Sequence, residues 1–259
     1  MINDLEQQRQ HFNEIAEKYF TARNHPNHLL LKKLIWEGFF SRQKNFGEKI
    51  HSVIEPMCGM GEGYDILHKH FSKDFRYLGF DYSENMVQIA KTARPQLDFS
   101  WGDVSSFDSR GKLFDMIILI GGLHHVYSRT ATVISSLKNV LVPNGYFLSL
   151  EPTHNNWIAR RARQRIYVKN DLFDNDTEQG FEYHDIDGHF KNAGFRKIDE
   201  VYPGLLAYIL YYNPDAFPSL NIGSQKLVKA CFGLDKLIWA NWLGRKLSFA
   251  TITLWQKTS

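Results

Sequence analysis

Cysteine is scarce in this chain of 259 residues, which contains only Cys58 and Cys231. The two lie far apart and outside any Cys-x-x-Cys or Cys/His pattern, so the sequence predicts neither a disulfide framework nor a zinc site. Acidic residues do not gather with histidine in a ligand-like pattern either, and we expect no bound metal. Few and isolated cysteines are typical of a reducing compartment, so we expect a cytoplasmic protein.

A long apolar run and a strong net charge are also missing. No stretch approaches the roughly 18 apolar residues of a membrane-spanning helix, and the polar N-terminus has no signal-peptide core. The 31 basic and 28 acidic residues give a net charge of +3, too small to predict nucleic-acid binding by itself. With 43% hydrophobic residues, the chain will bury a core, as one large α/β domain with an elaboration or as two small domains.

Between residues 50 and 150, short apolar runs alternate with longer runs of helical period, which is typical of repeated strand–helix units. The pattern predicts strands near 51–55, 75–80, 97–101, 114–120 and 145–151, and helices near 63–71, 84–92 and 130–140. It predicts a further helix at 188–193 and strands at 195–202 and 248–255. Crossovers of this length imply parallel strands with helices on both faces of the sheet.

Segments of a different character precede and interrupt this core. Residues 1–20 and 28–40 have helical periodicity, and we assign 1–44 as an N-terminal helical lid or cap of a main domain at 45–259. Simple packing on the sheet is the alternative for these helices. An aromatic-rich insertion occupies about 203–246, and a basic stretch at 157–169 is followed by an acidic one at 171–187.

A glycine-rich turn follows the first predicted strand, in Val53-Ile-Glu-Pro-Met-Cys-Gly-Met-Gly-Glu-Gly63. Glycine permits unusual φ values and lets a ligand approach the backbone, and the next helix begins with free N–H groups. Turns without ligands use glycine as well. The third glycine of a nicotinamide-type Gly-x-Gly-x-x-Gly is replaced by Tyr64, and no Gly-Lys-Ser/Thr of a phosphate loop follows. Both of those nucleotide sites are therefore disfavoured.

Five segments between residues 45 and 155 combine a predicted strand with a polar or glycine-containing turn, which follows the strand in the first four and leads into it in the fifth. They are Glu55-Pro-Met-Cys-Gly-Met-Gly61, Tyr77-Leu-Gly-Phe-Asp-Tyr-Ser-Glu-Asn-Met86, Trp101-Gly-Asp-Val104, Phe114-Asp-Met-Ile-Ile-Leu-Ile-Gly-Gly-Leu-His-His-Val126 and Leu141-Val-Pro-Asn-Gly-Tyr146. In this order they resemble the motifs of the class I S-adenosylmethionine-dependent methyltransferases. The resemblance implies an α/β fold with a Rossmann-like seven-stranded sheet, mostly parallel with an antiparallel last strand. Met57, where most members have glycine, and the insertion between the last two strands depart from the family pattern.

The resemblance also implies a cofactor, S-adenosylmethionine, bound at the carboxyl edge of the sheet. Glu55 would hold the amino group of its methionine part, Asp81 the two ribose hydroxyls and Asp103 the adenine, since a carboxylate accepts strong hydrogen bonds from paired donors. The cofactor-binding candidates are Glu55, Met57, Gly59, Gly61, Asp81, Tyr82, Met86, Gly102, Asp103, Val104, Ile120 and Gly121. A helix N-cap at Asp81 and a turn at Asp103 are the structural alternatives.

Methyl transfer from a sulfonium is an in-line substitution, which needs alignment and, for a protonated acceptor, a base. His125 and, as second choice, His124 follow the fourth strand and are the catalytic candidates, because imidazole titrates near neutral pH. A purely structural placement of this pair is the alternative. The substrate-binding candidates are Tyr19, Arg23, His28, Glu151, His154 and Asn155.

The acceptor itself has two interpretations. The basic stretch and the aromatic insertion fall where such folds shape the acceptor site, so we expect a large amphiphilic acceptor with a possible peripheral membrane contact, or a small soluble one. An inactive binding module that keeps the fold and an RNA methyltransferase are the alternatives. The presence of Glu55, Asp81 and Asp103 weighs against the inactive binding module. Gly121-Gly-Leu-His124, in place of an Asn-Pro-Pro-Tyr-type loop, weighs against the second. The oligomeric state stays open.

Overall fold

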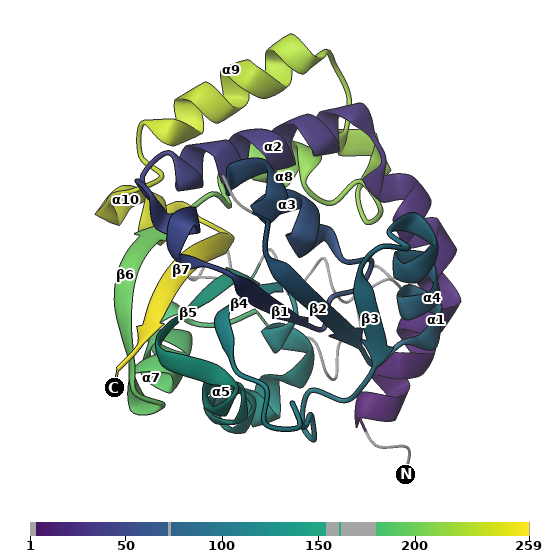
Figure 1. Ribbon diagram of the computed structural model, residues 1–259. Coiled ribbons are helices and arrows are strands. Elements are labelled where there is room, and N and C mark those ends of the chain that lie inside the picture. The colour runs from purple at the N-terminus through teal and green to yellow at the C-terminus, as the bar shows by residue number, and fades with distance from the viewer. Residues whose placement is uncertain (1–3, 72–73, 154–160, 162–179, 259) are drawn as a thin grey trace.

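A single seven-stranded sheet forms the centre of the computed structural model, which describes residues 4–71, 74–153, 161 and 180–258 (Figure 1). Its strands are β1 (Ser52–Pro56), β2 (Arg76–Asp81), β3 (Asp98–Trp101), β4 (Phe114–Ile120), β5 (Leu141–Pro152), β6 (Phe195–Val201) and β7 (Ala250–Lys257). They lie in the order β3-β2-β1-β4-β5-β7-β6. Only β7 runs antiparallel to its neighbours, β5 and β6. The predicted mostly parallel sheet with an antiparallel last strand is confirmed.

Helices cover both faces of the sheet, as predicted. On one face lie α2 (Pro26–Phe40), α3 (Glu62–His70) and α4 (Glu84–Ala93), and on the other lie α5 (Thr130–Asn139) and α7 (Tyr183–Asn192). Successive residues of a strand point to opposite faces. In β4, Met116 and Ile118 therefore join the first core, whereas Ile117 and Leu119 join the second. This double burial explains why the central strands are almost continuously apolar in sequence.

Asp115 is the exception within β4, and its environment accounts for it. Its carboxylate accepts hydrogen bonds from the backbone N–H groups of His51 and Ser52, both at 2.9 Å. Oδ2 of Asp115 therefore lies at the start of β1, where its hydrogen bonds fix the alignment of the two central strands.

The strand order changes direction at β1, because β2 pairs with one side of it and β4 with the other. The loop after β1 leads to α3, and the loop after β4 leads to the 3₁₀ segment η2 (Leu123–Arg129), so the two loops leave the carboxyl edge on opposite faces. Ligands of open α/β sheets bind in the crevice at such a point. The topology alone therefore directs attention to the tips of β1, β2 and β4.

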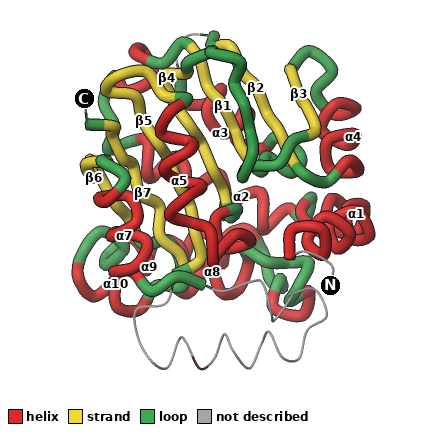
Figure 2. The backbone as a smooth tube through the Cα atoms, turned by 90° about the horizontal axis from the view of Figure 1, so that it is seen from below, coloured by secondary structure: helices red, strands yellow, loops and turns green. Residues whose placement is uncertain are grey.

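The N-terminal and inserted segments surround this edge. Helix α1 (Asp4–Arg23) lies beside α4 at the β3 end of the sheet (Figures 1 and 2). The insertion forms α8 (Leu206–Tyr211), η3 (Pro218–Leu220), α9 (Gln225–Lys236) and α10 (Trp242–Leu247). Helix α9 contacts α2 and α8 and forms the outermost layer on that side (Figure 1).

Two boundaries differ from the sequence prediction by four residues or more. Strand β5 begins at Leu141 rather than 145, and its pairing with β4 shifts register between Phe114 and Met116. Helix α7 begins at Tyr183 rather than 188. The loop after β4 winds into η2, which periodicity did not predict because the segment is short. The basic stretch at 157–169 lies, apart from residue 161, outside the described residues. Of the described helices, none combines the length and hydrophobicity that a bilayer crossing requires.

Candidate functional site

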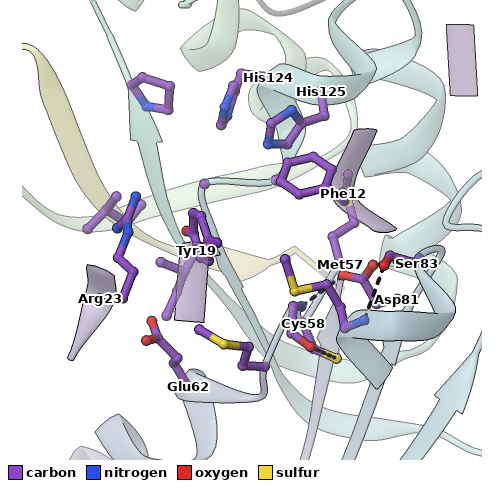
Figure 3. A pocket seen from close by; sticks show the side chains of 18 of the residues that line it. Phe12, Tyr19, Arg23, Met57, Cys58, Glu62, Asp81, Ser83, His124 and His125 are labelled. Atoms are coloured by element: carbon purple, nitrogen blue, oxygen red, sulfur yellow. Dashed lines mark hydrogen bonds between the residues drawn. The ribbon is translucent and has the colours of Figure 1, made fainter. Parts of the chain in front are cut away.

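A cavity of about 450 Å³ lies at the carboxyl edge of the sheet (Figure 3). The loops after β1, β2, β3 and β4 form one side of it, while α1 and the segment around α8 form the other. Figure 3 shows Phe12, Tyr19 and Arg23 of α1 around the same space as Met57 and Asp81. The size suits a small-molecule site, and the position is the crevice expected from the strand order.

The glycine turn after β1 contains three residues with left-handed φ, namely Met57 (52°), Gly59 (50°) and Gly61 (78°). A Cβ at Gly59 would meet no atom within 4 Å, so the backbone there borders open space in the cavity wall. A Cβ at Gly61 would lie 2.5 Å from the ring of Phe99, and Gly61 does not line the cavity. Gly61 therefore serves packing, contrary to its selection as a ligand contact. Met57 keeps a conformation that non-glycine residues rarely adopt.

Glu55 ends β1 with a buried carboxyl group that is only 2% exposed. It accepts hydrogen bonds from the N–H of Gly63, at 3.1 Å, and from the hydroxyl of Tyr77. Burial raises the pKa of Glu55 to about 8, against the lowering effect of these two donors. A Cβ on Gly63 would lie 2.6 Å from this carboxyl, so any larger residue there would displace the Glu55 side chain. A cation entering the cavity would favour the charged form of Glu55.

Asp81 joins the tip of β2 to the glycine turn. Its carboxylate accepts from the N–H of Gly59 at 2.8 Å and from the N–H of Ser83 at 2.9 Å, and it lines the cavity. Burial raises the pKa of Asp81 above its usual value. The N-cap of α4 is Ser83, whose hydroxyl accepts from the N–H of Met86 at 3.1 Å. Asp81 is thus not the helix cap that the structural alternative proposed.

The remaining cofactor candidates come together in the same cavity wall. Asp103 accepts from the N–H of Ser105 at 2.7 Å, as a turn-forming residue does, and also borders the cavity. Tyr82 stacks on Trp101 with 5.5 Å between ring centroids. Apart from Gly61, all the predicted cofactor residues line the cavity: Glu55, Met57, Gly59, Asp81, Tyr82, Met86, Gly102, Asp103, Val104, Ile120 and Gly121.

The two histidines after β4 have different surroundings, although both line the cavity. Nδ1 of His124 lies 3.1 Å from Oε2 of Glu151. The ring of His125 packs edge-on against Phe12 at 4.9 Å and lies 3.9 Å from the ring of His124. A carboxylate that receives Nδ1–H fixes the tautomer and leaves Nε2 as the basic atom. This arrangement distinguishes His124.

Glu151 does not face the cavity, contrary to its selection as an acceptor contact. Leu150 and Pro152 line the cavity, and the alternation of β5 turns Glu151 away from it. The side chain is 1% exposed, and its Oε1 accepts from the N–H groups of Gly122 (3.0 Å) and Leu123 (2.9 Å). Burial raises the pKa of Glu151 to about 7, opposed by these donors. Its contacts therefore support the loop that carries His124.

The other predicted substrate contacts divide in the same way. Tyr19 and Arg23 line the cavity. His28 is 0% exposed and lies behind the cavity wall, with Nδ1 3.3 Å from the carbonyl oxygen of Tyr211. Burial lowers the pKa of His28 to about 3, so it stays neutral and structural at physiological pH. His154 and Asn155 lie outside the described residues.

The cavity half opposite the glycine turn is mainly aromatic and apolar. Tyr208 and Tyr212 stack with centroids 4.2 Å apart. Sequence reasoning had not singled out several lining residues individually: Phe12, Ile15, Met60, Glu62, Tyr208, Ile209, Tyr212, Asp215, Phe217, Leu220 and Phe249. For Phe12 and Ile15 a signal existed, since they share with Tyr19 the helical spacing that puts all three on one face of α1.

Two ion pairs border this half of the cavity. Arg23 pairs with Asp215 at 3.0 Å and stacks over the ring of Tyr19 at 4.5 Å. Glu62 pairs with Lys32. Burial would raise the pKa of Glu62, but the ammonium of Lys32 holds it at about 2. Each of these charges has a partner of opposite sign, so the surrounding aromatic rings dominate the surface offered to a ligand. Among the residues that the structure describes, no group of three or more histidine, cysteine or acidic side chains could hold a metal ion.

Comparison with known proteins identifies a family to which part of the chain is similar. Residues 53–145, which include β1 to β4, the glycine turn and the histidine pair, match the family model described as a methyltransferase domain. These residues belong to that family. The match includes every cofactor candidate of the cavity wall and ends within β5.

Two curated relatives are methyltransferases. The chain is 31% identical over 163 residues to a demethylmenaquinone methyltransferase of Leptospira interrogans, covering 58% of this chain and 63% of that protein. It is 24% identical over 187 residues to a fatty-acid O-methyltransferase of Mycolicibacterium smegmatis, covering 70% of this chain and 66% of that protein. The chain thus spans slightly less than two thirds of the length of these relatives.

Solved structures share the fold at low sequence identity. The cyclase SpnF, a (4+2)-cyclase, has a TM-score of 0.64 at 13% identity, covering 97% of this chain and 95% of that chain. Magnesium protoporphyrin IX methyltransferase of Synechocystis, solved with bound SAH, has a TM-score of 0.62 at 13% identity, covering 97% of this chain and 99% of that chain. At such identity the likeness establishes the Rossmann-like methyltransferase fold, while function must be argued from the site.

Proposed function

We propose that this protein transfers a methyl group from S-adenosylmethionine to a small, largely apolar or amphiphilic acceptor. The observation that carries the proposal is the meeting of Glu55, Asp81 and Asp103, from three successive strand tips, in one cavity beside the open backbone of Gly59. Carboxylates at those tips match the donor groups of an adenosyl ligand with a cationic amino group. The methyltransferase family of residues 53–145 supports the same ligand.

The residues present fit this cofactor. A Cβ-free stretch of wall at Gly59 would let a ligand lie against the backbone. Glu55 would hold the amino group, Asp81 the ribose hydroxyls and Asp103 the adenine, with Met86 and Val104 as apolar cover. The raised pKa values of Glu55 and Asp81 mean that burial disfavours their charged forms. A ligand that brings a cationic amino group and hydroxyl donors would stabilise the charged carboxylates and would therefore bind favourably there.

When bound, S-adenosylmethionine supplies an electrophilic methyl group on its sulfonium. The protein would contribute alignment, exclusion of water by α1 and α8, and a proton acceptor. We assign that last role to Nε2 of His124, because Glu151 orients its ring through Nδ1. The sequence favoured His125 over His124, and the contact with Glu151 is the reason for reversing that preference.

The acceptor side supports a ligand with a substantial apolar part. Tyr19, Tyr208, Tyr212, Phe217 and Phe249 supply aromatic wall, and the neighbouring charges are paired. The names of the two curated relatives specify a menaquinone precursor and a fatty acid as methyl acceptors. We therefore propose a lipid-like acceptor, with residues 1–44 as a lid and the insertion at 203–246 as part of the acceptor wall. A reducing, cytoplasmic location belongs to the proposal and rests on the two buried free thiols.

Calorimetry tests the cofactor, and a transfer assay tests the activity. S-adenosylmethionine and its demethylated product should both bind the unaltered protein, and Asp81→Ala should weaken both by about tenfold or more, the value of a lost charge-assisted bond. Equal binding to both proteins, or to neither, would count against the proposal. Radiolabelled methyl transfer to demethylmenaquinone and to a fatty acid then separates an enzyme from a binding module, since a module would bind the cofactor and label neither.

A further inference from the structure

The outer face of the insertion combines exposed apolar side chains with basic ones. Helix α9 buries Val228, Cys231, Phe232 and Asp235 against α2 and α8. Its other side faces outward, and a Cβ at Gly233 would meet nothing within 4 Å. The exposed large apolar residues of the segment 221–249 are Ile222 (67%), Leu227 (46%), Leu234 (59%), Leu237 (74%), Trp242 (63%), Leu243 (36%) and Leu247 (47%). We call this surface the α9–α10 face.

The charges on this face have one sign. The segment 221–249 contains five basic residues, Lys226, Lys229, Lys236, Arg245 and Lys246, and a single acid, Asp235. Asp235 is 5% exposed and accepts from the N–H groups of Leu206 and Ala207 at the start of α8. Its charge is therefore directed inward to the end of a neighbouring helix. The surface that remains is apolar and cationic.

Helical spacing orders these side chains. Leu227 and Leu234 are seven residues apart, as are Lys229 and Lys236, so each pair projects from one strip of α9. Positions two apart differ by about 200° around a helix, so the leucine strip and the lysine strip lie on opposite flanks of α9, with Lys226 and Leu237 between them on its outward side. In a lipid–water interface, leucine and tryptophan side chains lie among the acyl chains and lysine side chains lie at the headgroups.

We propose that the α9–α10 face docks on an anionic phospholipid bilayer. The charge complementarity selects this partner, because four to eight basic residues beside apolar ones bind acidic headgroups. This inference rests on the proposed function, because membrane docking serves a methyltransferase whose acceptor is lipid-like. Helix α8 lies beneath α9, and Tyr208 and Ile209 of α8 line the cavity, so docking brings the aromatic half of the cavity near the bilayer. A lipid-like acceptor would then enter from the membrane rather than from solution.

Vesicle co-sedimentation tests the docking with the complete protein. Binding is expected to vesicles of phosphatidylcholine mixed with phosphatidylglycerol, and much less to phosphatidylcholine alone. The double variants Leu234→Ser/Leu237→Ser and Lys226→Glu/Lys229→Glu should each bind about tenfold more weakly or worse. Leu113→Ser, a change of an exposed leucine outside this face (45%), is the control and should bind like the unaltered protein. Added salt should weaken binding by screening.

A second measurement reports insertion directly. Trp242 is 63% exposed, and its fluorescence should shift to the blue when mixed vesicles are added, a shift that Trp242→Phe removes. Failure of the unaltered protein to bind mixed vesicles would overturn the inference, as would full binding by the Lys226→Glu/Lys229→Glu variant. A dimer that forms in the absence of lipid and is lost in Leu234→Ser/Leu237→Ser would assign the face to a second copy instead.

Calorimetry with S-adenosylmethionine on the same samples separates this inference from the proposed function. The α9–α10 variants alter no cavity-lining residue, so cofactor affinity should be unchanged in them. Cofactor binding without vesicle binding would overturn the docking alone. Vesicle binding without cofactor binding would support the docking and overturn the proposed function.

Discussion

Nδ1 of His124 lies 3.1 Å from Oε2 of Glu151, a carboxylate whose other oxygen accepts two backbone N–H groups of the loop that carries the histidine. One buried acid thus orders the loop after β4 and orients the imidazole within it. Glu151 itself stays out of the cavity. We propose that Glu151 positions the histidine, and that the histidine it holds is the base if the acceptor requires one.

Substitution of each histidine should distinguish the two. His124→Gln is expected to lower kcat by about a hundredfold or more, the usual value of a general base, whereas His125→Gln should lower it less than tenfold. Glu151→Gln should lower kcat and change its pH profile while leaving cofactor affinity intact. Steady-state kinetics across pH, with calorimetry for the cofactor, measure both effects. A larger loss in His125→Gln would return the role to His125.

The pH dependence of folding should reflect the two buried glutamates. Burial raises the pKa of Glu55 to about 8 and of Glu151 to about 7, from 4.5 in exposed chains. At these two groups the folded state therefore binds more protons than the unfolded state, from pH 4.5 to about 8 for Glu55 and from pH 4.5 to about 7 for Glu151. Across its window each group should lower the free energy of unfolding by up to about 1.4 kcal/mol per pH unit. Their contribution is fully present below pH 4.5 and is lost as pH rises through the folded pKa.

Denaturant titrations at several pH values measure this slope. Glu55→Gln and Glu151→Gln should each flatten it, because glutamine does not titrate. A slope that is the same in both variants as in the unaltered protein would contradict the assigned burial effect.

Gly63→Ala should damage the wall beside Glu55. The added Cβ would lie 2.6 Å from the carboxyl group, so the expected loss is about 1–3 kcal/mol of stability, as in other overpacked sites, together with weaker cofactor binding. Gly188→Ala in α7 is the matched control, since its Cβ would meet nothing within 4 Å. That helix-interior change should stabilise the protein by about 0.5–1 kcal/mol. Chemical denaturation of both variants measures the change in the free energy of unfolding. Equal changes in the two variants would contradict a clash between the added Cβ and the Glu55 carboxyl.

Asn13 should govern how firmly α1 closes the cavity. Its side chain accepts from the hydroxyl of Ser83 at 2.7 Å and donates to Glu84 at 3.1 Å, at the beginning of α4. We expect Asn13→Ala to raise the dissociation rate of S-adenosylmethionine several-fold, because α1 is released more easily. Stopped-flow displacement measures the rate, and Glu14→Ala, at an exposed position on the same helix, serves as control. An unchanged rate in Asn13→Ala would speak against α1 as a lid.

The sequence alone predicted the sheet and the position of the acidic wall, for a physical reason. Buried parallel strands are recognisable in a sequence as apolar runs, and their carboxyl ends meet at one edge of the sheet. Glu55, Asp81 and Asp103, which lie at or just after three such ends, were therefore expected to lie close together. The resemblance to the methyltransferase motifs singled out these three acids among the residues near strand ends.

The failures concern the direction in which single side chains point. Glu151 also ends a strand, but the alternation of β5 directs it to the face opposite Leu150 and Pro152. Gly61 looked equivalent to Gly59 until the ring of Phe99, distant in sequence, was seen beside it. His28 of α2 is buried against the backbone carbonyl of Tyr211 in α8, another contact that spacing could not predict. Local pattern determines elements, whereas such contacts depend on how distant elements pack.

The position of β7 in the sheet determines the order in which the strands can pair during synthesis. This strand is the last of the seven in sequence, yet it lies between β5 and β6. During synthesis β6 is therefore made before β7, its neighbour in the sheet. It cannot pair until the whole insertion and then β7 have been synthesised. The half of the sheet from β3 to β5 can assemble first, whereas Tyr208, Tyr212 and Phe217 of the cavity wall belong to the segment between β6 and β7 and take their places only when β7 joins the sheet.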